Sequence, residues 1–300
     1  MNKLLAMSLV ASVATILPVG AAPAIAQSDW DSVTIKAEQI APGVSVLFGR
    51  GGNIGVSHGE DGTIIIDDQF APLTDKIEAA IAALGANPVK YVVNTHWHFD
   101  HTGGNENFGK GGATIFAHHN VRTRMEDGGT VVGNVTPPAP KEALPVVTYD
   151  QGMRFHVNAD TINLMYVGGG HTDGDSVVMW EKANVIHMGD LYITIKSFPF
   201  VDRDSGGNVY NLMRTLDIVL AMIDDETKVI PGHGAMSNKA ELSAFRAVIG
   251  QAVERVEALR EEGKTLDEAV AAKPLADFNR EGGFISGDAF VKAIWSSMGD

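Results

Sequence analysis

Short apolar runs alternate with glycine-containing polar turns along most of the chain. Three strand-like runs, at 44–48, 54–58 and 63–66, are separated by turns short enough to predict an antiparallel meander. At 72–84 the period changes, because apolar residues recur three or four positions apart. That spacing predicts a helix with one apolar face.

The remainder of the chain repeats this change of period. Residues 128–140 are rich in Gly and Pro and predict a mobile loop. Because strand-like runs followed by helix-like segments occur twice along the chain, we expect one domain made of two α/β halves. The further expected elements are strands at 89–94 and 113–117, a short helix from Asn120, a strand series from 146 to 188, and helices at 209–222 and 241–260.

The predicted strand at 89–94 leads into the most informative stretch of the sequence. Residues 95–101 read Thr-His-Trp-His-Phe-Asp-His, which places three imidazoles and a carboxylate within six residues. Such side chains suit zinc and other borderline divalent metals. His96 and His98 are two positions apart and can face one metal from a turn. Asp100 and His101 would then point toward a second position nearby.

Three later strand-like runs end in the same way, in glycine-rich turns that carry His or Asp. These are Gly168–Asp175 with His171, Gly189-Asp190, and Pro231–Gly234 with His233. Glycine lets the backbone approach a bound ion closely and adopt positive φ. If the strands lie side by side, the four junctions converge.

These motifs, HxHxDH, GGGHT, GD and PGHG in that order, resemble the metallo-β-lactamase superfamily from Ile40 to the C-terminal helix. The resemblance implies an α+β fold, a four-layer αββα sandwich with metals at one edge. It implies two Zn²⁺ ions, with Fe or Mn as alternative metals. The implied ligands are His96, His98 and His171 for the first ion, Asp100, His101 and His233 for the second, and Asp190 bridging both.

The resemblance also implies supporting roles for other residues. Asp67 matches a buried aspartate of the family, expected to accept a hydrogen bond from a ligand imidazole or nearby backbone. The expected catalytic groups are Asp100, which orients a bridging hydroxide, and Asp190, which neutralises and spaces the metals. Trp97, Tyr192 and Lys196 are candidate substrate contacts.

The N-terminal 26 residues predict a secretory signal. Lys3 is followed by an apolar stretch, and Ala24-Ile25-Ala26 is typical of a cleavage site after Ala26. We expect residues 27–300 to form a single catalytic domain in the periplasm or outside the cell. Because no other segment approaches a transmembrane helix, we expect no stable membrane insertion after cleavage.

The charge and composition of the chain limit the classes of partner and metal ligand that we expect. The formal net charge is −14, so the chain lacks the basic surface that neutralises phosphates, and we do not expect nucleic acid as a substrate. The sequence contains no cysteine, which excludes both disulfides and a thiolate ligand. Oligomeric state is left open.

The expected reaction is attack of a metal-bound hydroxide on the carbonyl of a small amide, lactam, ester or lactone. β-Lactamase activity falls within that set. An Asp at position 190, where true metallo-β-lactamases carry Cys or Ser, is more similar to lactonases and thioesterases of the glyoxalase II type. A glyoxalase II-type thioesterase and a mononuclear iron oxidoreductase of the persulfide dioxygenase type remain alternatives. We expect specificity to come from the loops at 50–53, 128–140 and 192–207.

Overall fold

The structure is a computed structural model that describes residues 30–131, 133–278, 280 and 282–299. The expected signal segment, residues 1–26, lies outside the described residues. Val33 to Asp300 forms one compact unit. Within the described part of the chain, no helix is long and apolar enough to cross a membrane.

Seven strands form the first sheet, in the order β1-β2-β3-β4-β5-β6-β9. The strands β1 to β4 pair antiparallel, as the predicted meander requires, and the strands from β4 to β9 pair parallel. Their bounds are β1 Lys36–Ala41, β2 Val44–Phe48, β3 Ile54–Gly59, β4 Gly62–Ile66, β5 Val89–Asn94, β6 Thr114–His118 and β9 Val147–Tyr149.

Six strands form the second sheet, in the order β10-β11-β12-β13-β14-β15. All neighbours pair antiparallel except β13 and β14, which are parallel. Their bounds are β10 Gly152–Val157, β11 Asp160–Tyr166, β12 Ser176–Trp180, β13 Val185–His187, β14 Lys228–Ile230 and β15 Ser237–Asn238.

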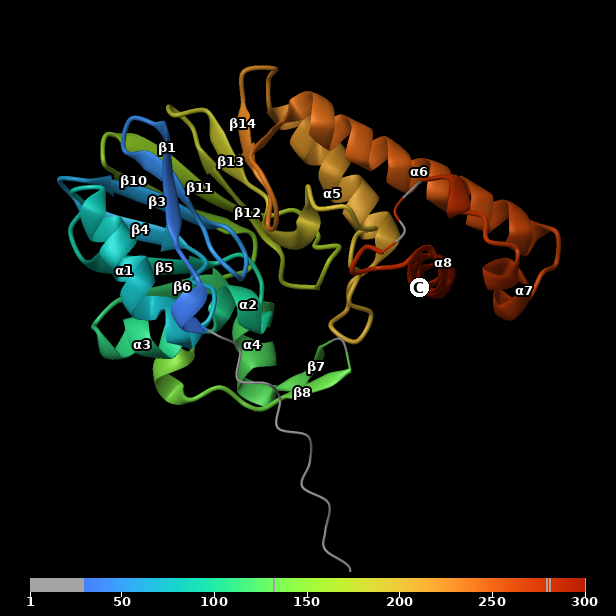
Figure 1. Cartoon of the computed structure of the whole chain (residues 1–300), viewed down its shortest axis with the longest axis horizontal. Helices are drawn as coiled ribbons and strands as arrows, with labels where there is room; N and C mark the ends of the chain where they lie inside the picture. The colour runs from blue at the N-terminus through green and yellow to red at the C-terminus, as the bar shows by residue number, and fades with distance from the viewer. Residues whose placement is uncertain (1–29, 132, 279, 281, 300) are drawn as a thin grey trace, which may run out of the picture. The chain divides into compact units, whose positions relative to one another are not determined.

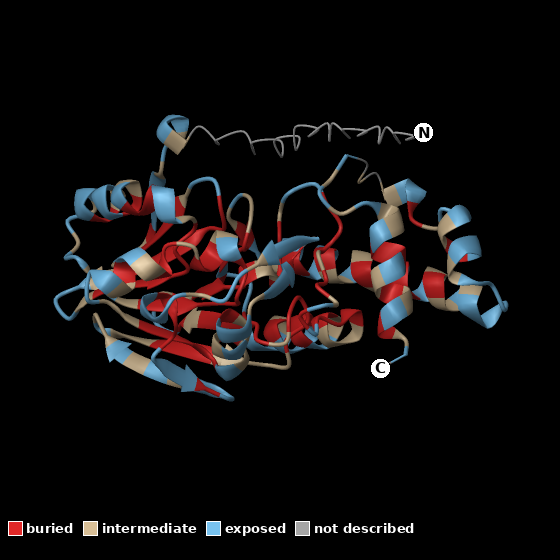
Figure 2. Ribbon diagram, turned by 90° about the horizontal axis from the view of Figure 1, so that it is seen from below, coloured by how far each residue is buried: buried red, intermediate tan, exposed pale blue. Residues whose placement is uncertain are grey.

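The two sheets pack face to face. Side chains alternate along each strand, so Ile64 and Ile66 of β4 point into the space between the sheets. There they join Leu164 and Trp180 of the second sheet in one buried cluster. Figure 2 shows many of the strand residues in red, the colour of buried residues. Removal of these apolar surfaces from water stabilises the sandwich.

Helices cover the two outer faces (Figure 1). Against the first sheet lie α1 (Thr74–Ala83) and α3 (Asn105–Lys110). Against the second lie α5 (Val209–Met222), α6 (Lys239–Glu261) and α8 (Gly287–Ser297), which share a buried cluster with β12 to β14. The α+β sandwich predicted from the sequence is therefore confirmed. The remaining helices are α2 Phe99–Thr102, α4 His119–Asp127, α7 Leu266–Ala271 and the 3₁₀ turns η1 Trp30–Ser32, η2 Ala71–Leu73, η3 Lys141–Ala143, η4 Gly189–Leu191 and η5 Ala276–Phe278.

Two elements differ from the sequence predictions. The edge strand β1 was not predicted, because only Ile40 of its six residues is buried and no apolar alternation marks it. The segment 128–140, predicted as a mobile loop, instead contains a hairpin of β7 (Gly129–Val131) and β8 (Asn134–Thr136). Gly128 and Gly133 have positive φ, so the glycines that suggested a loop serve the turns of this hairpin.

Candidate metal centre

The metal-ligand candidates gather where four strands end. β5 of the first sheet runs into the histidine-rich loop, while β11, β13 and β14 of the second sheet lead to His171, Asp190 and His233. β13 and β14 are parallel, so Asp190 and His233 emerge at the same edge. The predicted convergence of four junctions is what the structure shows.

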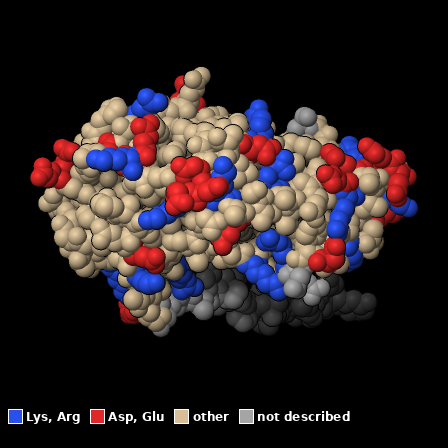
Figure 3. Space-filling view, turned by 90° about the horizontal axis from the view of Figure 1, so that it is seen from above, with Lys and Arg blue, Asp and Glu red and all other residues tan. Residues whose placement is uncertain are grey.

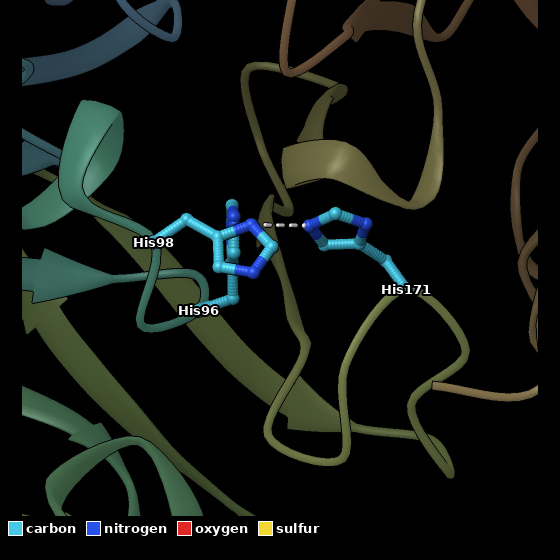
Figure 4. A group of neighbouring side chains, drawn as sticks. All are labelled: His96, His98 and His171. Carbon is cyan, nitrogen blue, oxygen red and sulfur yellow. Dashed lines mark hydrogen bonds between the residues drawn. The ribbon is translucent and has the colours of Figure 1, made fainter. Parts of the chain in front are cut away.

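His96, His98 and His171 form the first donor group. Their imidazoles point toward one another (Figure 4), and Nδ1 of His98 lies 2.9 Å from Nε2 of His171. One nitrogen of each ring lies within 4.8 Å of the others. Nε2 of His96 is buried without a hydrogen-bond partner. An orphaned, buried imidazole nitrogen among two others fits a cation at this point.

Asp100, His101 and His233 form a second donor group, with ligand atoms also within 4.8 Å of one another. Oδ2 of Asp100 lies 3.2 Å from Nε2 of His233. His101 belongs to a further group with His96 and Asp190. The two groups are therefore contiguous rather than separate.

Asp190 lies between the two groups. Its Oδ1 is 3.2 Å from Nε2 of His101 and 3.4 Å from Nε2 of His233, and its Oδ2 is 3.8 Å from Nε2 of His171. Oδ1 nevertheless has no hydrogen bond of good geometry and is buried. Gly232 packs so closely that a Cβ there would lie 2.0 Å from Oδ1, so the glycine leaves room for this carboxylate. Imidazole nitrogens around a shared carboxylate suit a pair of divalent ions.

Asp67 contacts the ring nitrogen of His101 that faces away from the donor group. Its Oδ2 lies 2.8 Å from Nδ1 of His101, and its Oδ1 accepts a hydrogen bond from the Thr95 backbone at 2.7 Å. This contact with Nδ1 leaves Nε2 of His101 facing the donor group. The structure therefore places Asp67 against both a ligand imidazole and the backbone.

Asp202 holds His98 in the same way, and sequence reasoning missed it. Its Oδ2 lies 2.9 Å from Nε2 of His98 and accepts a hydrogen bond from Ser205, which in turn accepts one from Trp97. The only sequence signal was its position within the loop 192–207. That loop also supplies the Phe200 carbonyl, 2.7 Å from Nδ1 of His171.

The three candidate substrate contacts lie in different surroundings. Trp97 is 3% exposed, and its indole N–H donates a hydrogen bond to the Ser205 hydroxyl. Tyr192 is 2% exposed, packs on Phe245, and shares a 2.7 Å hydrogen bond between its hydroxyl and Ser237. Both side chains are buried in this structure. Lys196 is exposed on the surface.

Burial and charge divide the imidazoles into two kinds. Burial, with the neighbouring imidazole of His98, lowers the pKa of His171 to about 4, and similar causes lower that of His96. Burial also acts to lower the pKa of His233, but the carboxylates of Asp190 and Asp100 outweigh it and raise that pKa to about 10. The pKa of His101 is raised for the same reason. A metal ion bound at the second group would therefore displace protons from these imidazoles.

Access to the centre is one-sided. The side chains of His98, His101 and His171 are at most 4% exposed. Those of Asp100 and His233 are 24% and 23% exposed. The exposed flank of the centre is therefore the one formed by Asp100 and His233.

Comparison with known proteins agrees with this geometry. The family model of the metallo-beta-lactamase superfamily matches residues 47–233, more than half of the chain. The chain belongs to the metallo-β-lactamase superfamily. A hydroxyacylglutathione hydrolase from Methylococcus capsulatus is 26% identical over 223 residues, which cover 73% of this chain and 77% of that protein.

Solved structures show the same fold. A metallo-β-lactamase from Pontibacter korlensis matches with a TM-score of 0.61 at 18% identity, over 72% of this chain and 99% of that chain. The sec-alkyl sulfatase PisA1, solved as a double mutant, matches with a TM-score of 0.67 at 16% identity, over 88% of this chain and 50% of that chain. The family and its relatives assign the chain as a metal-dependent hydrolase.

Proposed function

We propose that this metallo-β-lactamase-fold hydrolase is dinuclear and cleaves the carbonyl–heteroatom bond of a small amide, lactam, ester or lactone. The observation that carries the proposal is the position of Asp190, within 3.8 Å of imidazoles of both donor groups. Structural zinc needs four protein ligands and no open position, whereas seven donors surround this centre and one flank is accessible. This arrangement favours catalysis over a structural role.

Divalent ions held by these side chains would supply an activated water and offset the charge that develops on a carbonyl oxygen. Burial acts to raise the pKa of Asp100, but the charges of His101 and the contact with His233 outweigh it and lower that pKa. Asp100 is therefore ionised at neutral pH. Because it lies on the accessible flank, its carboxylate is placed to accept a hydrogen bond from the attacking water and orient it.

Asp67 and Asp202 keep the imidazoles in position. Each binds one nitrogen of a histidine and leaves the other nitrogen directed at the centre. Such buried carboxylate–histidine contacts fix ring orientation and tautomer. The proposed metals are two Zn²⁺ ions, with Fe or Mn as the alternatives that the donor set also accepts.

A second candidate function is a thioesterase of the glyoxalase II type. The observation that favours it is the Methylococcus capsulatus relative, named a hydroxyacylglutathione hydrolase and matched over 77% of its length. A mononuclear iron oxidoreductase acting on persulfides is distinguished from both by its metal. It would contain one iron per chain and consume oxygen.

The test is a panel assay on protein loaded separately with Zn, Mn or Fe. A β-lactam, a lactone, a thioester and a phosphodiester are compared side by side, with Asp190→Ala as the inactive variant. Asp217→Ala, which removes an exposed partner of Arg246, is the matched control. We expect carbonyl hydrolysis by the zinc protein and the control only. Oxygen uptake by a one-iron protein, or activity retained in Asp190→Ala, would contradict the proposal.

We also propose that the enzyme is exported to the periplasm or the medium, on the basis of the signal-like residues 1–26. The mass of the protein recovered from the producing cells tests this. A chain beginning at Gln27 is expected, and an uncleaved chain in the cytoplasm would contradict it.

A further inference from the structure

Asn53 connects the loop between β2 and β3 to the turn that carries His233. Its backbone N–H donates to the Gly232 carbonyl at 2.7 Å. Its side-chain amide donates to the carbonyls of Pro231 and Gly234, each at 2.9 Å. Asn53 is 4% exposed. One buried residue outside the four metal motifs therefore binds backbone carbonyls on both sides of a candidate ligand.

His187 connects the same residue to the turn that carries Asp190. Its Nδ1 accepts a hydrogen bond from the Gly189 N–H at 3.1 Å, and its Nε2 lies 2.9 Å from the Asn53 carbonyl oxygen. Because Nδ1 is an acceptor, the ring proton is on Nε2, which donates to Asn53. The imidazole lies on β13 and is fully buried. Both of its hydrogen bonds go to backbone groups.

Four hydrogen bonds close these contacts into a ring. The bond not yet described runs from the Gly232 N–H to the Gly189 carbonyl, at 2.8 Å. We call this circuit the Asn53 ring, and its four members are Asn53, Gly232, Gly189 and His187. Two of the members directly precede candidate ligands, His233 and Asp190. Because the circuit is closed, neither ligand turn can shift without lengthening hydrogen bonds on both of its sides.

Close packing also restricts the two ligand turns. A Cβ on Gly232 would lie 2.0 Å from Oδ1 of Asp190, and one on Gly189 would lie 2.7 Å from Oγ1 of Thr95. In this arrangement Oδ1 of Asp190 lies 3.4 Å from Nε2 of His233. A shift of either turn would change that distance.

Resting on the proposed dinuclear hydrolase function, we propose that Asn53 and His187 are positioning residues that hold Asp190 and His233 at the separation that a second metal ion requires. Neither belongs to the candidate ligand groups. They act through the backbone of the residues that precede the two ligands. Hydrogen bonds that orient ligands in advance raise metal affinity, because less reorganisation is needed when the ion binds.

The first donor group is held by other contacts. Asp202 lies against Nε2 of His98, and the Phe200 carbonyl lies against Nδ1 of His171. Both contacts come from the loop 192–207 rather than from the Asn53 ring. Loss of the ring should therefore weaken binding of the second ion more than binding of the first.

The Asn53 ring is made of uncharged groups. Hydrogen bonds between buried neutral groups are not screened by salt, whereas interactions between exposed charges are. Figure 3 shows exposed acidic and basic side chains interspersed over one face of the molecule. The effect of breaking the ring on zinc affinity should therefore persist as NaCl is raised.

Stepwise zinc affinities test the proposal. Asn53→Ala removes the side-chain amide, and Asn53→Leu replaces it with a branched apolar group. We expect both variants to weaken binding of the second ion about 10- to 100-fold and to leave the first nearly unchanged. Competition with chelators measures the two dissociation constants. Ring-nitrogen shifts of His98 and His233 in protein labelled with ¹⁵N-histidine identify the group that each ion occupies.

Variants of His187 separate hydrogen bonding from the filling of space. His187→Gln keeps a donor near the position of Nε2, whereas His187→Leu fills similar space without a hydrogen bond. The Gln variant should retain more of the second-ion affinity than the Leu variant. In wild type, long-range ¹H–¹⁵N spectra should show the Nε2–H tautomer of His187 with and without zinc.

Two matched controls lie away from the ring. Asn107→Ala removes an exposed asparagine of α3 whose amide also donates to a backbone carbonyl, that of Ala71. His156→Ala removes an exposed imidazole of β10 that lies 3.3 Å from the Thr161 hydroxyl. Both controls should bind two ions with wild-type affinities.

The outcomes separate the two proposals. One ion per wild-type chain at saturation would contradict the dinuclear function, and with it a role of the ring toward a second ion. Two ions in wild type, with both or neither weakened in the Asn53 variants, would overturn the positioning inference alone. Equal losses in His187→Gln and His187→Leu, or an Nδ1–H tautomer of His187, would also overturn it.

Discussion

Oδ2 of Asp202 lies 2.9 Å from Nε2 of His98, and both side chains are only 4% exposed. The contact comes from opposite halves of the chain and turns Nδ1 of His98 toward His171. Ser205 and Trp97 extend it into a buried chain of hydrogen bonds. The orientation of a candidate ligand thus depends on a residue outside all four metal motifs.

Asp202→Ala should weaken zinc binding. With its carboxylate gone, the His98 ring is free to rotate or change tautomer, and we expect affinity to fall about 10- to 100-fold. Competition with a chromophoric chelator measures this. Asp202→Asn keeps one acceptor and should restore part of the affinity, and Asp217→Ala should leave it intact. Wild-type affinity in Asp202→Ala would refute this positioning role.

Gly52→Ala should disturb the centre from the other side. A Cβ at this position would meet the His101 ring, which is fully buried and cannot move without shifting its neighbours. We expect a loss of stability of about 1–3 kcal/mol and weaker zinc binding. Gly287→Ala is the matched control, because its added Cβ meets its nearest neighbour at an ordinary 3.5 Å. Equal denaturation midpoints for both variants would argue against the close approach.

Metal affinity should rise with pH. Asp190 and Asp100 raise the pKa of His233 to about 10 against the effect of burial, so a proton must leave before the imidazole binds a metal. Between pH 6 and 8, zinc affinity should increase about tenfold per pH unit for each proton displaced. Calorimetry in buffers of different ionisation enthalpy counts those protons. A value of zero at pH 7 would contradict the protonated state.

The same raised pKa predicts the opposite trend for the metal-free protein. Stability contributed by protonated His233 is fully present below its ordinary pKa of 6.5 and is lost as pH rises toward about 10. Denaturation of the chelated protein at pH 6.5 and 9 checks the sign. Greater stability at pH 9 would be inconsistent with it.

Tyr192→Phe separates a core residue from a substrate contact. The hydroxyl bonds to Ser237 in the core, so its removal should cost about 1 kcal/mol of stability and leave KM unchanged. Thermal unfolding and kinetics on the best panel substrate measure both. A large rise in KM without a stability change would restore the substrate role.

Local patterns predicted much of the fold. Apolar runs such as those of β2 and β5 were recognisable because each is short, buried and ended by a turn. The edge strand β1 was not, because an exposed strand is held by backbone pairing that leaves little trace in side-chain polarity. The hairpin of β7 and β8 was hidden for the same reason, since its residues are mostly exposed.

The site was predictable where chemistry is concentrated in sequence. The close spacing of the ligand candidates from His96 to His101 predicts a metal site on its own. The structure places them near His171, Asp190 and His233. Asp202 could not be predicted in this way, because it is a single aspartate in a polar loop. Only the folded chain shows that it contacts His98. Tyr192 is close to Asp190 in sequence, but its side chain is buried and its hydroxyl bonds to Ser237, a direction that sequence alone does not reveal.

Metal stoichiometry tests the central claim most directly. The protein, stripped with chelator and titrated with zinc, should bind two ions per chain by elemental analysis after gel filtration, and Asp190→Ala should retain fewer than two. A single ion per wild-type chain at saturation, or two ions retained by Asp190→Ala, would contradict a shared centre built by these seven side chains.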